Sequence, residues 1–183
     1  MHRTSVASRS AVAWPPWCSA RGPLVFNRIL VTLDGSEYAE SAIPYAKDLG
    51  GAPGATVILV SVVEPRADAS AEELERSERV ITEYLAEQEA VLRADGVQNA
   101  SSTVVRGEAA RSIAEVARDE RCDVVIMSAL GLGAERGHSI GSIALRVLST
   151  TPCPVLMIRI DQPAPAQDSA EARWQDEGGA HVG

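Results

Sequence analysis

The chain has 183 residues, of which 45% are hydrophobic and only 4% aromatic, and its formal net charge is −8. A chain of this length buries one sizeable core, and the composition makes that core aliphatic. The acidic balance argues against a nucleic-acid partner, which requires a basic face. The longest apolar run, residues 57–63 interrupted by Ser61, is far below the roughly 18 residues of a membrane-spanning helix. The three cysteines form no C-x-x-C pair, which favours reduced thiols and a cytoplasmic protein.

The two ends of the chain differ in composition from the middle. Residues 1–24 contain arginines but no acid, and they lack the continuous apolar stretch of a signal peptide. We interpret them as an N-terminal extension that is disordered or lies upstream of the natural translation start. Residues 161–183 are rich in Pro, Ala, Gly and acids, so a disordered tail is expected. The folded domain is therefore expected over residues 25–160.

The first half of this domain alternates between apolar runs and a helical pattern. Residues 29–33 predict a short strand. Ser36 is placed to cap a single helix, whose apolar positions recur until Gly50 and Gly51 end it. Residues 56–63 are continuous and β-branched, as in a parallel strand that is covered on both faces.

The second half continues the alternation. A capping box at residues 70–73 predicts a long helix that ends near Gly96. The elements predicted after it are a strand at 101–105, a helix at 108–121, a strand at 124–127, a helix at about 142–150 and a strand at 155–158. Strands that alternate with crossover helices predict an α/β fold, a doubly wound five-stranded parallel sheet.

The segment 128–142 connects the fourth strand to the last helix and contains glycines at 131, 133, 137 and 141. Backbone N–H groups at a helix N-terminus form an anion site, and glycine allows close approach because it has no Cβ. A glycine-rich loop that leads into such a terminus holds nucleotide phosphates in strand–loop–helix proteins. The segment therefore predicts phosphate binding at Gly141 and Ser142.

The spacing from Gly131 to Gly141 and Ser142 resembles the G-x2-G-x9-G-[S/T] nucleotide loop of the universal stress protein family. Ser128 stands where that motif has its first glycine, and Leu130 stands where a His is frequent. The resemblance covers about residues 26–160, with matching stretches at 26–36, 104–109, 122–127 and 151–158. It implies a Rossmann-like fold of the adenine nucleotide alpha hydrolase-like type, with strand order 3-2-1-4-5.

That strand order implies where the ligand lies. In open α/β sheets, ligands bind beyond the carboxyl ends of the strands at the point where the winding reverses, here between the first and fourth strands. Asp34 ends the first of these strands, and residues 128–131 end the other. The features at Asp34 and at the glycine loop are therefore expected on either side of one crevice.

The resemblance also implies a set of nucleotide-binding residues. These are Thr32, Asp34, Val62, Met127, Ser128, Gly131, Gly141, Ser142 and Ile143. In the implied roles, the backbone of Val62 binds adenine, and Thr32 and Asp34 line the base and ribose. Met127 and Ser128 lie beneath the ribose. The other four residues hold the phosphates. Two alternatives stay open: Asp34 equally suits a turn, and the Ser128 hydroxyl either crowds the ribose or bonds to it.

Functions of three classes are compatible with these residues. The first is an ATP-binding regulatory protein of the stress response, with Mg²⁺ as the counter-ion of the triphosphate. The second is a nucleotide-independent interaction dimer of the same fold. The third is a slow ATPase, against which stand the missing G-x4-G-K-[ST] loop and the absence of a clear base beside the phosphates. We expect a homodimer through the apolar edge strand 155–158 and an unidentified regulatory protein partner.

Overall fold

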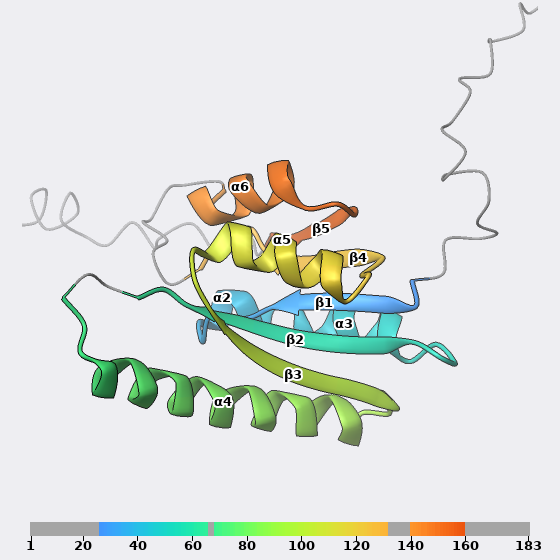
Figure 1. Cartoon of the computed structure of the whole chain (residues 1–183). Helices are drawn as coiled ribbons and strands as arrows, with labels where there is room; N and C mark the ends of the chain where they lie inside the picture. The colour runs from blue at the N-terminus through green and yellow to red at the C-terminus, as the bar shows by residue number, and fades with distance from the viewer. Residues whose placement is uncertain (1–25, 66–67, 132–139, 160–183) are drawn as a thin grey trace, which may run out of the picture.

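The computed structural model describes residues 26–65, 68–131 and 140–159. These residues form a five-stranded sheet with strand order β3-β2-β1-β4-β5, in which every neighbouring pair is parallel (Figure 1). The α/β fold and the strand order predicted from the sequence are confirmed. The extensions expected at 1–24 and 161–183 lie outside the described residues.

The strands are β1 (Arg28–Thr32), β2 (Thr56–Val63), β3 (Asn99–Arg106), β4 (Val124–Ser128) and β5 (Val155–Ile158). The helices are α2 (Glu37–Glu40), α3 (Ile43–Gly50), α4 (Ala71–Ala94), α5 (Ala109–Asp119) and α6 (Ser142–Thr150). Leu30 at the centre of β1 pairs with Ile58 on one side and Val125 on the other. The carboxyl ends of these three neighbouring strands therefore lie at the same edge of the sheet.

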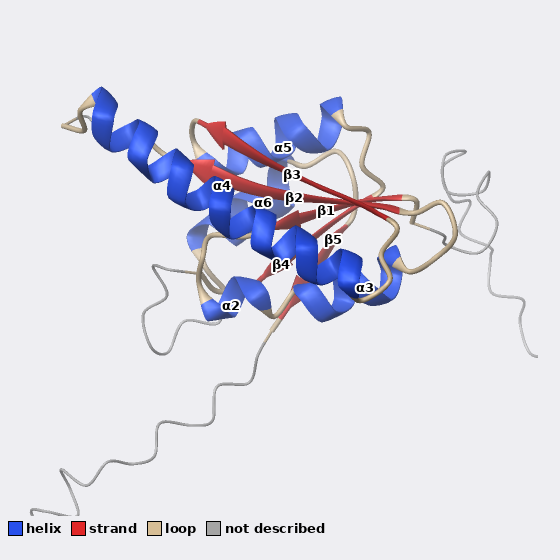
Figure 2. Ribbon diagram, turned by 90° about the horizontal axis from the view of Figure 1, so that it is seen from below, coloured by secondary structure: helices blue, strands red, loops and turns tan. Residues whose placement is uncertain are grey.

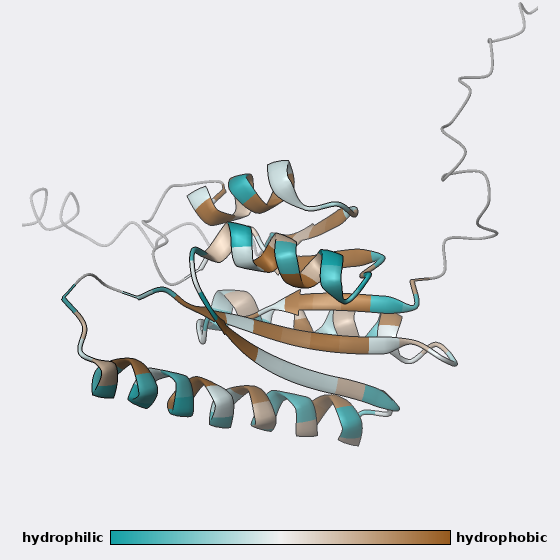
Figure 3. Ribbon diagram, viewed as in Figure 1, coloured by the Kyte–Doolittle hydropathy of each residue, from teal (hydrophilic) through white to brown (hydrophobic). Residues whose placement is uncertain are grey.

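Helices cover both faces of the sheet, with α2, α3 and α4 on one face and α5 and α6 on the other (Figures 1 and 2). Side chains of the central strands alternate between the two faces. Ile29 and Val31 belong to the apolar cluster with α3 and α4, while Leu30 belongs to the cluster with α5 and α6. Figure 3 shows the consequence, since the central strands are coloured as hydrophobic while α4 and α5 carry both colours.

The segment predicted as a single helix after Ser36 consists of two helices, which corrects the sequence interpretation. Ser36 does cap α2, since its Oγ accepts the N–H of Ala39 at 3.1 Å. Pro44 occupies the first turn of α3. Proline has no N–H to donate, and its ring collides with the carbonyl four residues earlier, so a helix cannot run through it. The apolar periodicity passes across this interruption because it takes no account of backbone hydrogen bonds.

Helix α4 begins as the sequence predicted. The Ser70 N–H donates to the Glu73 carboxylate at 2.8 Å, and the Glu73 N–H donates to Ser70 Oγ at 3.2 Å, which completes the capping box. Leu85 and Leu92 are the buried residues that hold this helix on the sheet. In the part of the chain that the structure describes, no helix combines the length and the apolar character needed to cross a membrane.

Candidate functional site

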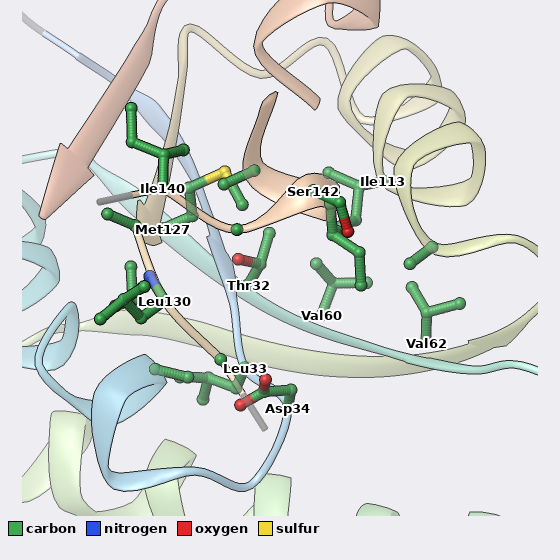
Figure 4. A pocket seen from close by; sticks show the side chains of 18 of the residues that line it. Thr32, Leu33, Asp34, Val60, Val62, Ile113, Met127, Leu130, Ile140 and Ser142 are labelled. Carbon is green, nitrogen blue, oxygen red and sulfur yellow. The ribbon is translucent and has the colours of Figure 1, made fainter. Parts of the chain in front are cut away.

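A cavity of about 530 Å³ opens at the carboxyl ends of the strands. Its lining includes every residue that the sequence predicted for the site: Thr32, Asp34, Val62, Met127, Ser128, Gly131, Gly141, Ser142 and Ile143. Figure 4 shows side chains from β1, β2, β4, α5 and α6 around this one space. Residues that are far apart in the sequence therefore meet in the crevice that the strand order located.

Asp34 follows β1 and forms a turn, the role that the sequence offered as an alternative to nucleotide binding. Its Oδ1 accepts the N–H of Ser36 at 3.0 Å and the Ser36 hydroxyl at 2.6 Å. Its Oδ2 lies against Gly131, so closely that a Cβ at position 131 would collide with it. One carboxylate therefore fixes the turn after β1 and also contacts the start of the glycine loop. Only glycine permits this approach without a shift of Asp34 or of the loop.

Ser128 ends β4 and is almost fully buried. Its Oγ accepts the N–H of Leu130 at 3.3 Å, a long hydrogen bond that closes a turn immediately after the strand. As a hydroxyl is both donor and acceptor, this contact does not use its proton. The Ser128 side chain thus has a local structural role and still lines the cavity.

Gly141 closes the loop and opens α6. Its N–H donates to the carbonyl of Ala129 at 2.7 Å, which brings the two ends of the loop together. Its carbonyl accepts the N–H of Leu145 at 3.1 Å, and none of the described side chains caps the helix. The N–H groups of the first helical turn, at Ser142, Ile143 and Ala144, have no carbonyl partner within the helix. These three groups, rather than the N–H of Gly141, are the donors that α6 presents to an anion.

Strand β2 extends beyond the end of β1, and this exposes part of its backbone edge. The Leu33 N–H donates to the Val60 carbonyl at 2.9 Å, toward β1, and the Gly107 N–H donates to the Val63 carbonyl at 3.1 Å, toward β3. Neighbouring residues of a strand direct their backbone groups to opposite sides, so Val62 faces the β1 side, as Val60 does. The Val62 N–H and carbonyl therefore point into the space beyond β1.

The first two turns of α5 contribute residues that were not predicted from the sequence. Ala109 and Ile113 line the cavity together with Glu64, the residue after β2. Glu64 Oε1 accepts the N–H of Ala109 at 2.6 Å. The predicted strand order could have indicated these residues. Since β3 lies beside β2, the helix that follows β3 must begin at the same edge of the sheet.

The charged side chains in the described part of the lining, Asp34 and Glu64, are both acidic. The predicted loop residues Gly133 and Gly137 lie outside the described residues. Over 26–65, 68–131 and 140–159, no three His, Cys, Asp or Glu side chains gather in a way that could hold a metal ion. Among the described lining residues, those of the first turn of α6 contribute the partial positive charge of a helix N-terminus.

Comparisons with known proteins agree with this architecture. The model of the universal stress protein family matches residues 26–159. A universal stress protein of Thermus aquaticus is 33% identical over 144 residues, covering 74% of this chain and 100% of the relative. The solved structure of the universal stress protein UspA from Lactobacillus plantarum has a TM-score of 0.67 at 20% identity, covering 73% of this chain and 97% of that one. The chain belongs to the universal stress protein family.

Two further structures with this fold contain adenine nucleotides. One is a universal stress protein in complex with cAMP, with a TM-score of 0.61 and 21% identity over 73% of this chain and 97% of that one. The other is the universal stress protein from Archaeoglobus fulgidus in complex with dAMP, with a TM-score of 0.56 and 19% identity over 74% and 99% of the two chains. Some proteins of this fold therefore bind adenine nucleotides.

Proposed function

We propose that the cavity binds ATP and that the protein acts in the stress response as a nucleotide-dependent regulator rather than as an efficient enzyme. The observation that carries this proposal is the uncapped N-terminus of α6, whose N–H groups at residues 142–144 adjoin the cavity. Helix N-termini of this kind bind phosphate. Gly141 carries no side chain that could cap these N–H groups, and Gly131 gives Asp34 room to contact the start of the loop that leads to them.

The order of the strand ends across the sheet suits a nucleotide. The loop after β4 supplies the phosphate end, Thr32 and Asp34 of the β1 end lie in the middle, and Val62 of β2 lies at the far side. Adjacent strands are about 4.8 Å apart, so three neighbouring strand ends span about 10 Å. In this placement the Val62 carbonyl accepts from the amino group of adenine and the Val62 N–H donates to the ring nitrogen beside it.

Mg²⁺ is proposed to accompany the triphosphate. The charged residues of the described lining are acidic, so a polyanion needs a counter-ion. Mg²⁺ is commonly held by substrate phosphates and water with few protein ligands. The described residues offer no preformed cluster for the ion, which fits a cation that enters already bound to the phosphates.

Titration of the full chain with ATP and Mg²⁺ in a calorimeter tests the proposal, together with native mass spectrometry of the purified protein. We expect one nucleotide per chain and phosphate release much slower than nucleotide exchange. An absence of binding at millimolar ATP would replace the proposal with the nucleotide-independent interaction dimer. Rapid release of phosphate would favour the ATPase instead.

We further propose that the protein forms a homodimer through β5. At the other edge of the sheet, α4 supplies polar cover to β3: Arg93 donates to the Ala100 carbonyl at 2.7 Å, and Ser102 donates to Glu89 at 2.8 Å. Strand β5 is apolar, and its Leu156 is 36% exposed. Exposed apolar edges of this type pair with another chain unless they are covered.

The matched variants Leu156→Asp and Val80→Asp test the dimer by sedimentation. Leu156 lies on β5, whereas Val80 is an equally apolar exposed residue on α4. In a two-fold contact one substitution acts twice, so Leu156→Asp is expected to yield monomers while Val80→Asp leaves the dimer intact. A monomeric wild type at tens of micromolar protein would refute the dimer.

A cytoplasmic location is part of the proposal. Cys122 and Cys153 are free thiols in the described part of the chain. Burial raises the pKa of the Cys122 thiol to about 12 and raises that of Cys153 as well. Such thiols stay protonated and unreactive near neutral pH, as suits a reducing compartment.

A further inference from the structure

Glu64 is an acidic residue at the base end of the proposed nucleotide site. It follows β2 directly. Val62 packs against the apolar cluster that includes α5, and Glu64 contacts the first residue of α5, so both residues lie on the α5 side of the sheet. The hydrogen bond from the Ala109 N–H holds Glu64 Oε1 against the first residue of α5. In the described part of the chain no Lys, Arg or His forms an ion pair with this carboxylate.

A carboxylate at neutral pH only accepts hydrogen bonds, and it has room for about four of them. The Ala109 N–H uses one of these places. The carboxylate therefore favours a ligand group that donates. Among purines, adenine carries an amino donor at position 6, while guanine and hypoxanthine carry a carbonyl acceptor there. An acceptor placed against Glu64 leaves both groups unpaired, which costs free energy.

We propose that Glu64 selects 6-amino purines over 6-oxo purines at this site. The inference rests on the proposed nucleotide binding and adds a second determinant to the Val62 backbone, which faces the same edge of the base. Glu64 comes from β2, whereas the phosphate donors follow β4 on the other side of β1. Its charge therefore lies at the base end of the site, away from the phosphate loop.

A different role for Glu64 would be to stabilise the start of α5 and nothing more. Glu108 is the matched control, because its carboxylate accepts the N–H groups of Ala110 and Arg111 at 3.0 Å each. Glu108 caps the same helix but is not part of the cavity lining. Loss of a carboxylate that only stabilises α5 would lower the melting temperature and would weaken ATP and ITP binding equally.

The test measures dissociation constants of ATP and ITP, each with Mg²⁺, by calorimetry on the full chain. The two nucleotides share the ribose and the triphosphate and differ at the position 6 edge of the base. Wild type is expected to prefer ATP by at least about 100-fold, because a site built for a donor strongly rejects an acceptor. Glu64→Ala is expected to reduce this preference about tenfold, the effect of one hydrogen bond to a charged group.

Two further variants separate recognition from folding. Glu64→Gln keeps an oxygen for Ala109 and adds an amide donor for the 6-oxo group, so the ATP preference should fall without loss of the fold. Glu108→Ala should lower the melting temperature and keep the preference within about twofold of wild type. A preference unchanged in both Glu64 variants overturns the inference. If wild type binds neither nucleotide, the proposed function itself fails, and the wild-type titrations alone show that outcome.

Discussion

Helices α5 and α6 both begin at the proposed nucleotide site, but they differ in whether carboxylates cap the N–H groups of the first turn. At α5, Glu64 and Glu108 accept the N–H groups of the first three helical residues, Ala109, Ala110 and Arg111. At α6, the capping residue is Gly141, and in the described part of the chain no side chain caps the first turn. Both termini carry the same partial positive charge. Two carboxylates of the protein neutralise the N-terminus of α5. In the proposed function, the N-terminus of α6 holds the phosphates.

This difference favours α6 as the helix that holds the phosphate in the proposed function. An anion at the start of α5 would displace or meet two carboxylates, whereas no side chain among residues 26–65, 68–131 and 140–159 caps the start of α6. Arg146 on α6 also pairs with Glu108 at 3.0 Å, so the two termini are linked through that ion pair. Substitutions that give α6 a cap like that of α5, or that remove features of either terminus, would therefore change nucleotide affinity or helix stability.

The largest effect is expected from Gly141→Asp, which gives α6 a carboxylate cap. The backbone at Gly141 suits a capping residue, and a Cβ there would lie 3.4 Å from the Ala129 carbonyl oxygen, so the side chain fits. The aspartate would occupy the phosphate donors and repel the phosphates, which should lower ATP affinity at least about 100-fold. The helix should keep its stability within a few tenths of a kcal/mol, because glycine is only slightly inferior at this position. Calorimetry and thermal melting measure the two effects.

Gly141→Asn is the matched control for that variant. Asparagine has the shape of aspartate and caps helices equally well, but it carries no charge. Its effect on ATP affinity should be smaller, at about tenfold, since only the competition for donors remains. Affinity within threefold of wild type for Gly141→Asp would mean that the phosphates lie elsewhere.

Gly131→Ala tests the close contact between Gly131, at the start of the glycine loop, and Asp34 in the turn after β1. The new Cβ would collide with Asp34 Oδ2, and the turn that Asp34 forms with Ser36 resists a shift. We expect about a tenfold loss of ATP affinity, from displacement of the loop that leads to α6. Gly51→Ala is the control, because a Cβ there would make only ordinary contacts in the exposed turn after α3. A Gly131→Ala variant that binds ATP like wild type would show that the loop relaxes freely.

Glu108→Gln tests the capped terminus through the pH dependence of stability. Burial raises the pKa of the Glu108 carboxyl, but the N–H groups of Arg111 and Ala110 and the charges of Arg146 and Arg111 outweigh it, so the pKa is lowered from 4.5. A lowered folded-state pKa contributes stability above the unfolded pKa, and that stability is lost as the pH falls through the folded value. The melting temperature of Glu108→Gln should be a few degrees below that of wild type at pH 7. The gap should close below about pH 4.5, and a gap that does not depend on pH would contradict a role for the charge.

The fold was readable from the sequence because its signals are local. Continuous β-branched runs, capping residues and glycine stops each depend on a few neighbouring residues, and together they predicted the elements of the domain. The helix after Ser36 was misjudged for the same reason. Its apolar period is local, but the break before Pro44 depends on a carbonyl one turn away and on a missing N–H. The strand order came from the family resemblance and not from any local pattern.

The candidate site was readable only in part. Glycines at 131 and 141 and the acid at 34 are visible in the chain, and all of them line the cavity. The hydrogen bond between Glu64 and Ala109 joins residues 45 positions apart, so no pattern in the sequence displays it. The donation from Gly141 to Ala129 likewise depends on how the loop closes. Residue types thus predicted an anion site near the glycine loop, while the difference between the two helix termini became visible only in the fold.

Ser128→Gly is expected to have the smallest effect, and it restores the glycine of the family motif. Its Oγ bond to the Leu130 N–H is 3.3 Å long, and so contributes less than the roughly 1 kcal/mol of a typical hydrogen bond. Removal of the hydroxymethyl group enlarges the cavity beneath the ribose and leaves the uncapped α6 terminus unchanged. ATP affinity should therefore equal or exceed that of wild type by up to about threefold, a difference of less than 1 kcal/mol. Competition titrations resolve such a difference. If affinity falls tenfold instead, the hydroxyl donates its proton to the nucleotide, and the serine is a binding residue that compensates for the crowding it causes.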